Sequence, residues 1–407
     1  MNPVHRSIGL IQWGWLFLVW AGFAGVNLYG EPPTPGTVTT LVSDGQLLQP
    51  YSVTLDKAGN VYITDAGHHV VRKLDASGHL TVVAGVPGRR EKYDKSSNSR
   101  EANPDKSCTT TTGDGCPATE ALFNFPRSLV VDAKGNLYIS DARASKIRRV
   151  DGSSGIVTVY AGAGEGGWAE TQLHNPEGMA LDTQGNLYVA DKRNNAIRKI
   201  TPPAQPLEKG TITTIAGLGP EAPGCGDGAP LAAAAAPLKE PQDVAIDTKG
   251  NLYIADTGCR RIRKLGADGV LRTLVGSGGG RLAQPSVPRD QPAKALDVNL
   301  VTPVGIEVDA KGNLYISDPG LNVVWFYDVA TDKARVIAGL PGPESAGYKI
   351  CREHANEFGD GCPGTQAKLN QPYRVAVAPN GDIYIPEQGG TVRPAPPYAI
   401  RVLHGVK

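Results

Sequence analysis

The chain of 407 residues lacks the short motifs of the common enzyme classes. It has no Gly-x-Ser-x-Gly elbow, no Walker loop and no His-Glu-x-x-His helix, which leaves hydrolase, nucleotide-dependent and zinc-peptidase chemistry unsupported. It also has little net charge, +1, with 41 lysines and arginines against 40 aspartates and glutamates. So close a balance provides no overall field to steer a nucleic acid or an anionic membrane. Glycine and proline are abundant instead, at 50 and 32 residues, which indicates a turn-rich all-β protein.

One ten-residue segment recurs six times along the chain. Its copies begin at Asp56, Asp132, Asp182, Asp247, Asp309 and, in degraded form, Ala378. The second copy reads Asp-Ala-Lys-Gly-Asn-Leu-Tyr-Ile-Ser-Asp, and the spacing between copies varies. Such internal similarity indicates a repeat architecture in which each unit is one supersecondary element.

Each unit predicts four short strands. In the second unit these are residues 128–132, 137–140, 146–150 and 156–160. The first two strands flank an Asp-x-x-Gly-Asn turn, in which the Asp side chain bonds backbone amides and the glycine supplies a positive φ. Six runs of four antiparallel strands predict a β-propeller, whose radial repetition leaves only short sheet edges.

The two ends of the chain predict how the ring closes. The sixth unit has three strands before Lys407, whereas an isolated fourth-strand pattern, residues 37–42, precedes the first unit. We expect this N-terminal strand to complete the last blade and to cover its open edge, which gives six blades.

The repeats resemble those of the NHL-repeat family. The resemblance is carried by segments such as 241–264, PQDVAIDTKGNLYIADTGCRRIRK, and extends over roughly residues 37–407. It implies a six-bladed all-β propeller of NHL type, similar to bacterial extracytoplasmic NHL-repeat proteins. It implies less about function, because the family includes RNA-binding and protein-binding modules and the related amidating lyases are metalloenzymes.

The N-terminal region predicts export. His5 and Arg6 precede an uncharged apolar stretch, so residues 1–30 form a signal peptide or, if uncleaved, a membrane anchor. Residues 31–36 are then a proline-rich spacer before the propeller at 37–407. We expect a periplasmic, secreted or envelope-anchored protein that meets a membrane only through this segment.

The six cysteines agree with export. All lie in connectors or loops, and we expect three disulfides: Cys108–Cys116, Cys351–Cys362 and Cys225–Cys259. Zinc ligation is the alternative, but the chain has no Cys-x-x-Cys pair.

The propeller face that carries the inter-blade connectors is the predicted place of function. All length variation falls in the connectors 86–121, 163–172, 218–237, 277–299 and 340–368. Binding surfaces are often built on such variable loops. The candidate binding residues on this face are His68, His69, Arg143, Arg193, Asn194 and Arg260.

Recurring aspartates end the second strands, at positions 65, 141, 191, 256 and 318. A ring of carboxylates is one interpretation, for metal binding or catalysis. The other is that each holds its own blade together, by accepting amides of the following loop or by pairing with an arginine of the third strand. A residue that recurs in five blades favours the structural interpretation, because a catalytic group should break the symmetry.

Histidines and basic residues leave two further alternatives. Scattered histidines, among them His174 and His354, have no metal-binding spacing, so we expect no cofactor, with calcium or zinc as the alternatives and the metal ligands unknown. Basic pairs such as Arg148-Arg149 recur on the third strands. We interpret them as the solvated side of each strand and expect no nucleic-acid partner.

The sequence therefore predicts a monomeric, exported, non-enzymatic binding module for a protein, peptide or glycan. The alternatives are a metal-dependent lyase or lactonase with its site at the propeller pore, and a scaffold of the cell envelope.

Overall fold

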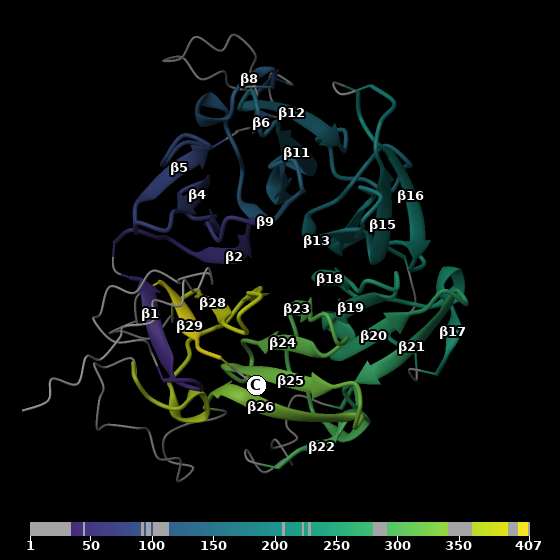
Figure 1. Cartoon of the computed structure of the whole chain (residues 1–407). Coiled ribbons are helices and arrows are strands. Elements are labelled where there is room, and N and C mark those ends of the chain that lie inside the picture. The colour runs from purple at the N-terminus through teal and green to yellow at the C-terminus, as the bar shows by residue number, and fades with distance from the viewer. Residues whose placement is uncertain are drawn as a thin grey trace, which may run out of the picture.

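Six blades surround a central channel in the computed structural model of this chain (Figure 1). The structure describes residues 34–43, 45–90, 114–205, 208–221, 224–226, 229–279, 291–340, 360–389 and 398–405, together with the backbone of 93–94 and 99–100. Each blade is an antiparallel sheet of four or five strands, and the first strand of each predicted four-strand unit lines the channel. The all-β, six-bladed prediction is confirmed.

The strands of the six blades follow one another along the chain. Blade 1 consists of β2 (Pro50–Leu55), β3 (Val61–Asp65), β4 (Val70–Leu74) and β5 (Leu80–Ala84). Blade 2 consists of β9 (Pro126–Val131), β10 (Leu137–Asp141), β11 (Lys146–Val150) and β12 (Ile156–Ala161). Blade 3 consists of β13 (Pro176–Leu181), β14 (Leu187–Asp191), β15 (Ala196–Thr201) and β16 (Thr211–Ala216).

The second half of the ring has the same order. Blade 4 consists of β18 (Asp243–Ile246), β19 (Leu252–Asp256), β20 (Arg261–Leu265) and β21 (Val270–Val275). Blade 5 consists of β23 (Gly305–Val308), β24 (Leu314–Asp318), β25 (Val323–Asp328) and β26 (Lys333–Gly339). Blade 6 contains β27 (Ala376–Val377), β28 (Ile383–Glu387) and β29 (Ala399–Leu403).

The N-terminal strand closes the ring as predicted. Strand β1 (Val38–Val42) pairs antiparallel with β29, with Val38 opposite Leu403 and Thr40 opposite Arg401. The first and last strands of the described chain therefore share one sheet, which protects an edge that would otherwise be open.

Three blades carry a fifth, outer strand that the sequence did not predict. The two-residue strands β8 (Cys116–Pro117), β17 (Leu231–Ala232) and β22 (Ala293–Lys294) pair with β12, β21 and β26. Each leads into a short 3-10 helix, namely η1 (Ala118–Glu120), η4 (Ala233–Ala235) and η6 (Ala295–Asp297). The connectors thus also cover the outer edges of these sheets.

The remaining short elements lie in loops and connectors. They are η2 (Ala142–Ala144), η3 (Lys192–Asn194), η5 (Thr257–Cys259), η8 (Gly364–Gln366) and the strand pair β6 (Tyr93–Asp94) and β7 (Ser99–Arg100). Among the described residues no helix is long and apolar enough to cross a membrane.

The recurring turn is held by its aspartate. In blade 1, Asp56 Oδ1 accepts the amides of Ala58 and Asn60, both at 2.9 Å, while the Asn60 side chain donates to Asp56 Oδ2 at 2.7 Å. Gly59 has φ 80°, a left-handed conformation that glycine adopts without strain. The same bonds recur at Asp132, which explains why the repeated segment is so regular.

The hydrophobic core lies between neighbouring blades. Between blades 4 and 5, for example, Tyr253 and Ile262 of blade 4 belong to the same buried cluster as Ile316 and Trp325 of blade 5. Trp325 is 1% exposed. Because each cluster belongs to two sheets, a blade depends on its neighbours and on ring closure for burial of its faces.

The predictions about the cysteines and about the N-terminal segment concern residues that the structure describes only in part. Cys225 and Cys259 form a disulfide with a Cα–Cα distance of 5.3 Å, as predicted. Cys108 and Cys351 lie outside the described residues, so the other two pairs stay predictions. The signal segment and residues 31–33 of the proline-rich spacer also lie outside them.

Deleting residues 31–42 should destabilise the whole propeller, because blade 6 then loses its outer strand and presents the edge of β29 to solvent. Deleting residues 1–30 alone is the matched control. We expect a lower and broader urea transition, followed by circular dichroism, for the longer deletion only. Superimposable transitions for the two truncated proteins would contradict closure by β1.

Candidate functional site

The recurring aspartates at the ends of the second strands have a structural role. Each accepts a backbone amide from a residue 17 positions earlier, at 2.6–2.8 Å, and the donors are Leu48, Asn124, His174, Lys239 and Val301. In blades 1 to 4 each also pairs with a third-strand arginine at 2.7–3.7 Å: Arg72, Arg148, Arg198 and Arg263. Each aspartate therefore fixes the connector that precedes its blade. The expected arginine pairing is therefore found in blades 1 to 4, and the expected amides of the following loop contribute at Asp318, through Gly320 and Leu321. The amide from the preceding connector was not expected.

Burial affects the charge of these carboxyls. It raises the pKa of Asp191, Asp256 and Asp318 to about 6, against the opposing effect of the backbone amides. In blade 6, Glu387 takes the same place and accepts the amide of Asn370 at 2.9 Å. None of these groups lines the central cavity, so they do not form a site there.

The six predicted binding residues do not form one cluster. His68, His69 and Arg143 belong to the adjacent loops of blades 1 and 2. His68 Nδ1 lies 2.8 Å from Asp65, and the buried His69 accepts the amide of Phe125 at 3.2 Å. Burial and the nearby Arg90 and Arg143 lower the pKa of His69 to about 4, so it is neutral at physiological pH.

The other three predicted residues lie on other blades. The Asn194 side chain is buried and donates to Gly167 O at 2.6 Å and to Asp191 at 2.7 Å. Arg260 donates to Gly279 O at 2.7 Å. Burial lowers the pKa of His174, and the nearby exposed Arg193 lowers it further. Asn194 and Arg260 thus tie loops together.

An aromatic and cationic patch that the sequence pattern did not predict lies where blades 1, 2 and 6 meet. Tyr51 packs edge-on against Tyr373 with centroids 4.7 Å apart and against Phe125 at 6.1 Å. Arg127 lies 4.1 Å from the Tyr51 ring, and Arg143 lies 4.0 Å from the Phe125 ring. Distances of this size are typical of cation–π contacts. These five residues are called the mouth patch below.

Phe125 has an unusual backbone conformation within the mouth patch. Its φ is 64°, in the left-handed region that bulky side chains rarely adopt. The corresponding position of blade 3 is occupied by Asn175, also with positive φ, and asparagine tolerates that region better. The fold therefore requires this backbone shape, whereas the choice of phenylalanine adds strain and a partly exposed ring.

A buried ion network lies next to the mouth patch, at the connector end of the channel. Glu177 on β13 receives Arg127 Nη1 at 3.1 Å, Arg374 Nη2 at 3.3 Å and Lys192 Nζ at 3.9 Å. The Glu177 side chain is fully buried, so it is stable as an anion only with such partners.

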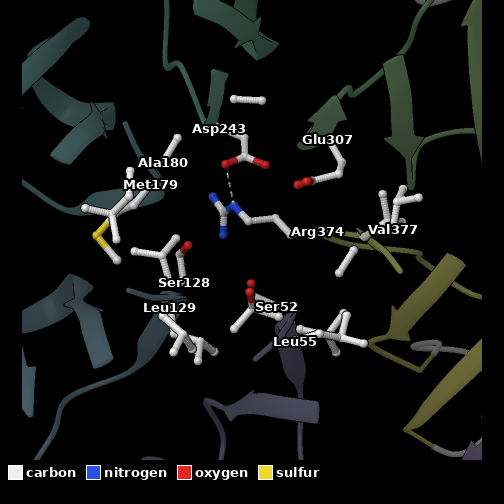
Figure 2. Close-up of a pocket in the computed structure, with 18 of the residues that line it drawn as sticks. Ser52, Leu55, Ser128, Leu129, Met179, Ala180, Asp243, Glu307, Arg374 and Val377 are labelled. Atoms are coloured by element: carbon white, nitrogen blue, oxygen red, sulfur yellow. Dashed lines mark ion pairs between the residues drawn. The ribbon is translucent and has the colours of Figure 1, made fainter. Parts of the chain in front are cut away.

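Arg374 crosses the channel to reach this network. Figure 2 shows its side chain extending from the blade 6 side toward Asp243, and its Nε lies 3.3 Å from Asp243 Oδ1. It also donates to the backbone carbonyls of Arg127, at 3.3 Å, and Gln242. Gly178 leaves the space for Asp243, because a Cβ there would collide with the aspartate side chain.

Asp243 is held from several sides. Its Oδ2 accepts the amide of Ile306 at 2.9 Å and its Oδ1 that of Val244 at 3.0 Å. Burial raises the pKa of Asp243 to about 6 although Arg374 opposes that rise. Arg374, Asp243 and Glu177 thus form a polar layer across the channel.

A cavity of about 440 Å³ lies beyond this polar layer, toward the face of the Asp-x-x-Gly-Asn turns. Its walls run along all six inner strands from Ser52 and Ser128 to Asp56 and Lys57 at the turn. The tyrosines of the mouth patch are not part of the lining. The channel therefore has two distinct ends, separated by the polar layer.

Glu307 is a second carboxylate, besides Asp243, that breaks the sixfold pattern inside the cavity. Measured from the turn glycine, the same position holds Thr54, Val130, Ala180, Ala245 and Ala376 in the other blades. Figure 2 shows Glu307 beside the Arg374–Asp243 pair. Its carboxylate makes no hydrogen bond or ion pair with any residue that the structure describes. Burial, and secondarily Asp243, raises the pKa of Glu307 to about 8.

The sequence contains a signal for the charged residues of the channel, but it lies at positions that differ between the repeats rather than at those that recur. When the six inner strands are aligned on their turn glycines, Asp243, Glu307 and Arg374 are the charged residues at positions where other blades have small or apolar side chains. Charge on a strand that faces a channel is informative because unpaired burial of charge is costly.

The fold and the channel define the class of protein as a six-bladed propeller with a polar layer across its pore. A model of the NHL repeat matches residues 173–200, and a model of the Teneurin NHL domain matches residues 218–292. These two matches support the predicted resemblance to the NHL-repeat family.

Similar proteins agree on the fold. Teneurin-3 of Mus musculus is 29% identical over 164 residues, which are 40% of this chain and 6% of Teneurin-3. A solved protein of unknown function from Bacteroides thetaiotaomicron has a TM-score of 0.57 and 18% identity, over 90% of this chain and 75% of that one. A gluconolactonase from Xanthomonas campestris has a TM-score of 0.50 and 13% identity, over 90% of this chain and 88% of that one. The two structures show the shared fold alone.

Glu307 should make the stability of the propeller depend on pH. Its pKa is raised from 4.5 to about 8 on folding, so the folded state binds the proton more tightly and stability falls as pH rises through this window. Above about pH 6.5 the buried aspartates have largely ionised, while Glu387, whose pKa burial raises to about 7, still contributes to the slope. The slope that Glu307 itself contributes approaches about 1.4 kcal/mol per pH unit at most.

The substitution Glu307→Gln should remove that slope, and the exposed Glu208→Gln on the same face should not. The measurement is the free energy of unfolding in urea between about pH 6.5 and 8.5. Parallel curves for wild type and Glu307→Gln would show that Glu307 is already ionised in the folded protein.

Proposed function

We propose that this propeller is a protein-binding module that holds an acidic, aromatic-containing segment of its partner on the mouth patch. NHL propeller domains generally mediate protein interactions, and the relatives matched here carry such domains. The observation that carries the proposal is Phe125, a partly exposed ring held in a left-handed backbone between two arginines. Strain of this kind persists where the surrounding structure or a function maintains it.

The charges around the mouth patch favour an acidic partner. Arg143 and Arg193 are exposed, and the side chains of Arg127 and Lys192 are 15% and 20% exposed. Their counter-ion Glu177 is completely buried beneath them. A docking segment therefore meets cations and aromatic rings, the residue types that dominate the binding energy of protein interfaces. Glycans and peptides from other sources are the other ligands that this face would suit.

Export supports a partner outside the cytoplasm. The disulfide between Cys225 and Cys259 is typical of oxidising compartments. Together with the apolar segment at residues 1–30, it supports an exported, monomeric module that contacts a membrane only through that segment. For an exported protein, RNA is then a less suitable anionic partner than an acidic protein segment.

The pore arrangement supports binding over the metal-dependent lyase or lactonase alternative. The guanidinium of Arg374 lies at ion-pair distance from both Asp243 and Glu177. It therefore occupies the position between these two carboxylates where a divalent cation would have to bind. The described residues include no group of three or more histidine, cysteine, aspartate or glutamate side chains that could hold a metal ion. No metal cofactor is part of the proposal.

Substitutions in the mouth patch should weaken peptide binding without unfolding the protein. The probe is a fluorescent synthetic peptide of alternating Asp and Glu with one central Trp, compared with its Lys and Arg counterpart by fluorescence anisotropy. Phe125→Asn, which installs the residue of blade 3, should lower affinity about tenfold or more, as expected for an aromatic anchor. Its melting temperature should stay near that of the wild type because the left-handed strain is relieved.

Arg272→Ala is the matched control, since Arg272 is an exposed arginine of β21 outside the mouth patch. It should bind the acidic peptide as the wild type does. Equal binding of the acidic and basic peptides, or unchanged affinity in Phe125→Asn, would overturn the proposal.

A further inference from the structure

We propose that the cavity at the turn end of the channel is a second binding site, for a small organic ammonium ion with a compact apolar body. This site is separated from the mouth patch by the layer of Arg374, Asp243 and Glu177. The two sites therefore open toward opposite faces of the propeller.

Glu307 is the group that recognises the ammonium ion. The charged residues that line the cavity are Asp56, Lys57, Asp243, Glu307 and Arg374. Asp243 and Arg374 neutralise one another, and Asp56 is engaged by its own turn through Ala58 and Asn60. Lys57 is exposed at the turn. Glu307 thus remains as the half-buried carboxylate of the cavity without a partner among the described residues, and a cation would supply that partner.

The walls of the cavity determine the rest of the ligand. Apolar side chains from all six blades line the same cavity as Glu307, namely Leu55, Val131, Leu181, Ile246, Val308 and Val377. At the position equivalent to Glu307, blades 3 and 4 have the small residues Ala180 and Ala245, which leave space in the channel at the level of Glu307. A volume of about 440 Å³ is in the range of sites for small molecules. The remaining walls are polar, so the unpaired Glu307 carboxylate beside these apolar side chains suits one ammonium group on a small hydrocarbon body.

A metal ion fits this cavity less well than an amine. Asp243 already accepts two backbone amides and pairs with Arg374, so Glu307 would be the main ligand to the metal. Magnesium and calcium ordinarily take six or more oxygen ligands, several of them from the protein. A monovalent ammonium ion needs only one carboxylate and hydrogen-bond acceptors such as Thr54 and Ser52.

Binding of the ammonium ion should release a proton. The groups that face Glu307 are Asp243, which disfavours its ionisation, Arg374, which favours it, and Asp56 and Lys57 at the turn. The raised pKa means that Glu307 is largely protonated near neutral pH. An ammonium ion stabilises the carboxylate form, so the proton leaves to buffer and affinity increases as pH rises toward about 8.

Isothermal titration calorimetry with benzylamine, benzyl alcohol and benzoate tests this site in the full propeller. The three probes share their ring and differ in charge. We expect benzylamine to bind at least tenfold more tightly than benzyl alcohol, and benzoate not to bind. The enthalpy measured in buffers of different ionisation enthalpy should report the released proton.

Three variants assign the binding. Glu307→Gln should lose at least tenfold in benzylamine affinity and should also lose the buffer dependence. Glu208→Gln, on the same face but outside the cavity, should change neither, and Phe125→Asn should leave benzylamine binding intact because the mouth patch is a separate site. The wild type also provides a readout that needs no variant, namely affinity that rises with pH.

Equal affinities for the amine and the alcohol would overturn the proposal, as would wild-type binding that does not depend on pH. Calcium chloride that competes with benzylamine through Glu307 would assign the carboxylate to a metal site instead, and would also overturn it.

Discussion

The guanidinium of Arg374 is the group on which the channel depends. It extends from blade 6 and lies at ion-pair distance from Glu177 of blade 3 and Asp243 of blade 4. It also donates to the backbone of blade 2 through Arg127 O and to Gln242 O. Four of the six blades therefore meet at one side chain.

This arrangement is economical for a repeat protein. Inner strands bring six similar segments toward one axis, where identical charges would repel one another and a bare pore would fill with water. Arg374 pairs with Asp243 and Glu177, each on a different blade, and Arg127 supplies a second positive charge to Glu177. The two sites on either side of the layer can then have different chemistry, cationic and aromatic at the connectors and apolar with one carboxylate at the turns.

Recurring sequence features predicted the fold because they act locally. The Asp-x-x-Gly-Asn turn is held by bonds within a few residues of Asp56, so its pattern can be recognised without knowledge of the tertiary structure. The closing strand was recognisable because one strand was missing at the end of the chain and one was present at the start. The two-residue fifth strands are too short to leave a periodic pattern, and they exist only because the connectors pass along a sheet edge.

The site was harder to predict for the opposite reason. The recurring aspartates attracted attention, yet recurrence reflects a shared structural task in every blade. Arg374, Asp243 and Glu307 each occur once, and nothing local to any of them shows that they converge on one axis. The register of six inner strands brings them together, and that register becomes visible only in the folded ring.

A double-mutant cycle on Arg374 and Asp243 tests most directly whether the polar layer holds the channel together. The variants are Arg374→Met, Asp243→Asn and the double substitution, with the free energy of unfolding measured for each. Coupling of about 1–3 kcal/mol is expected for a buried ion pair that is in contact. The double variant should therefore lose less free energy of unfolding than the sum of the losses of the two single variants. Additive effects, with coupling near zero, would contradict the account.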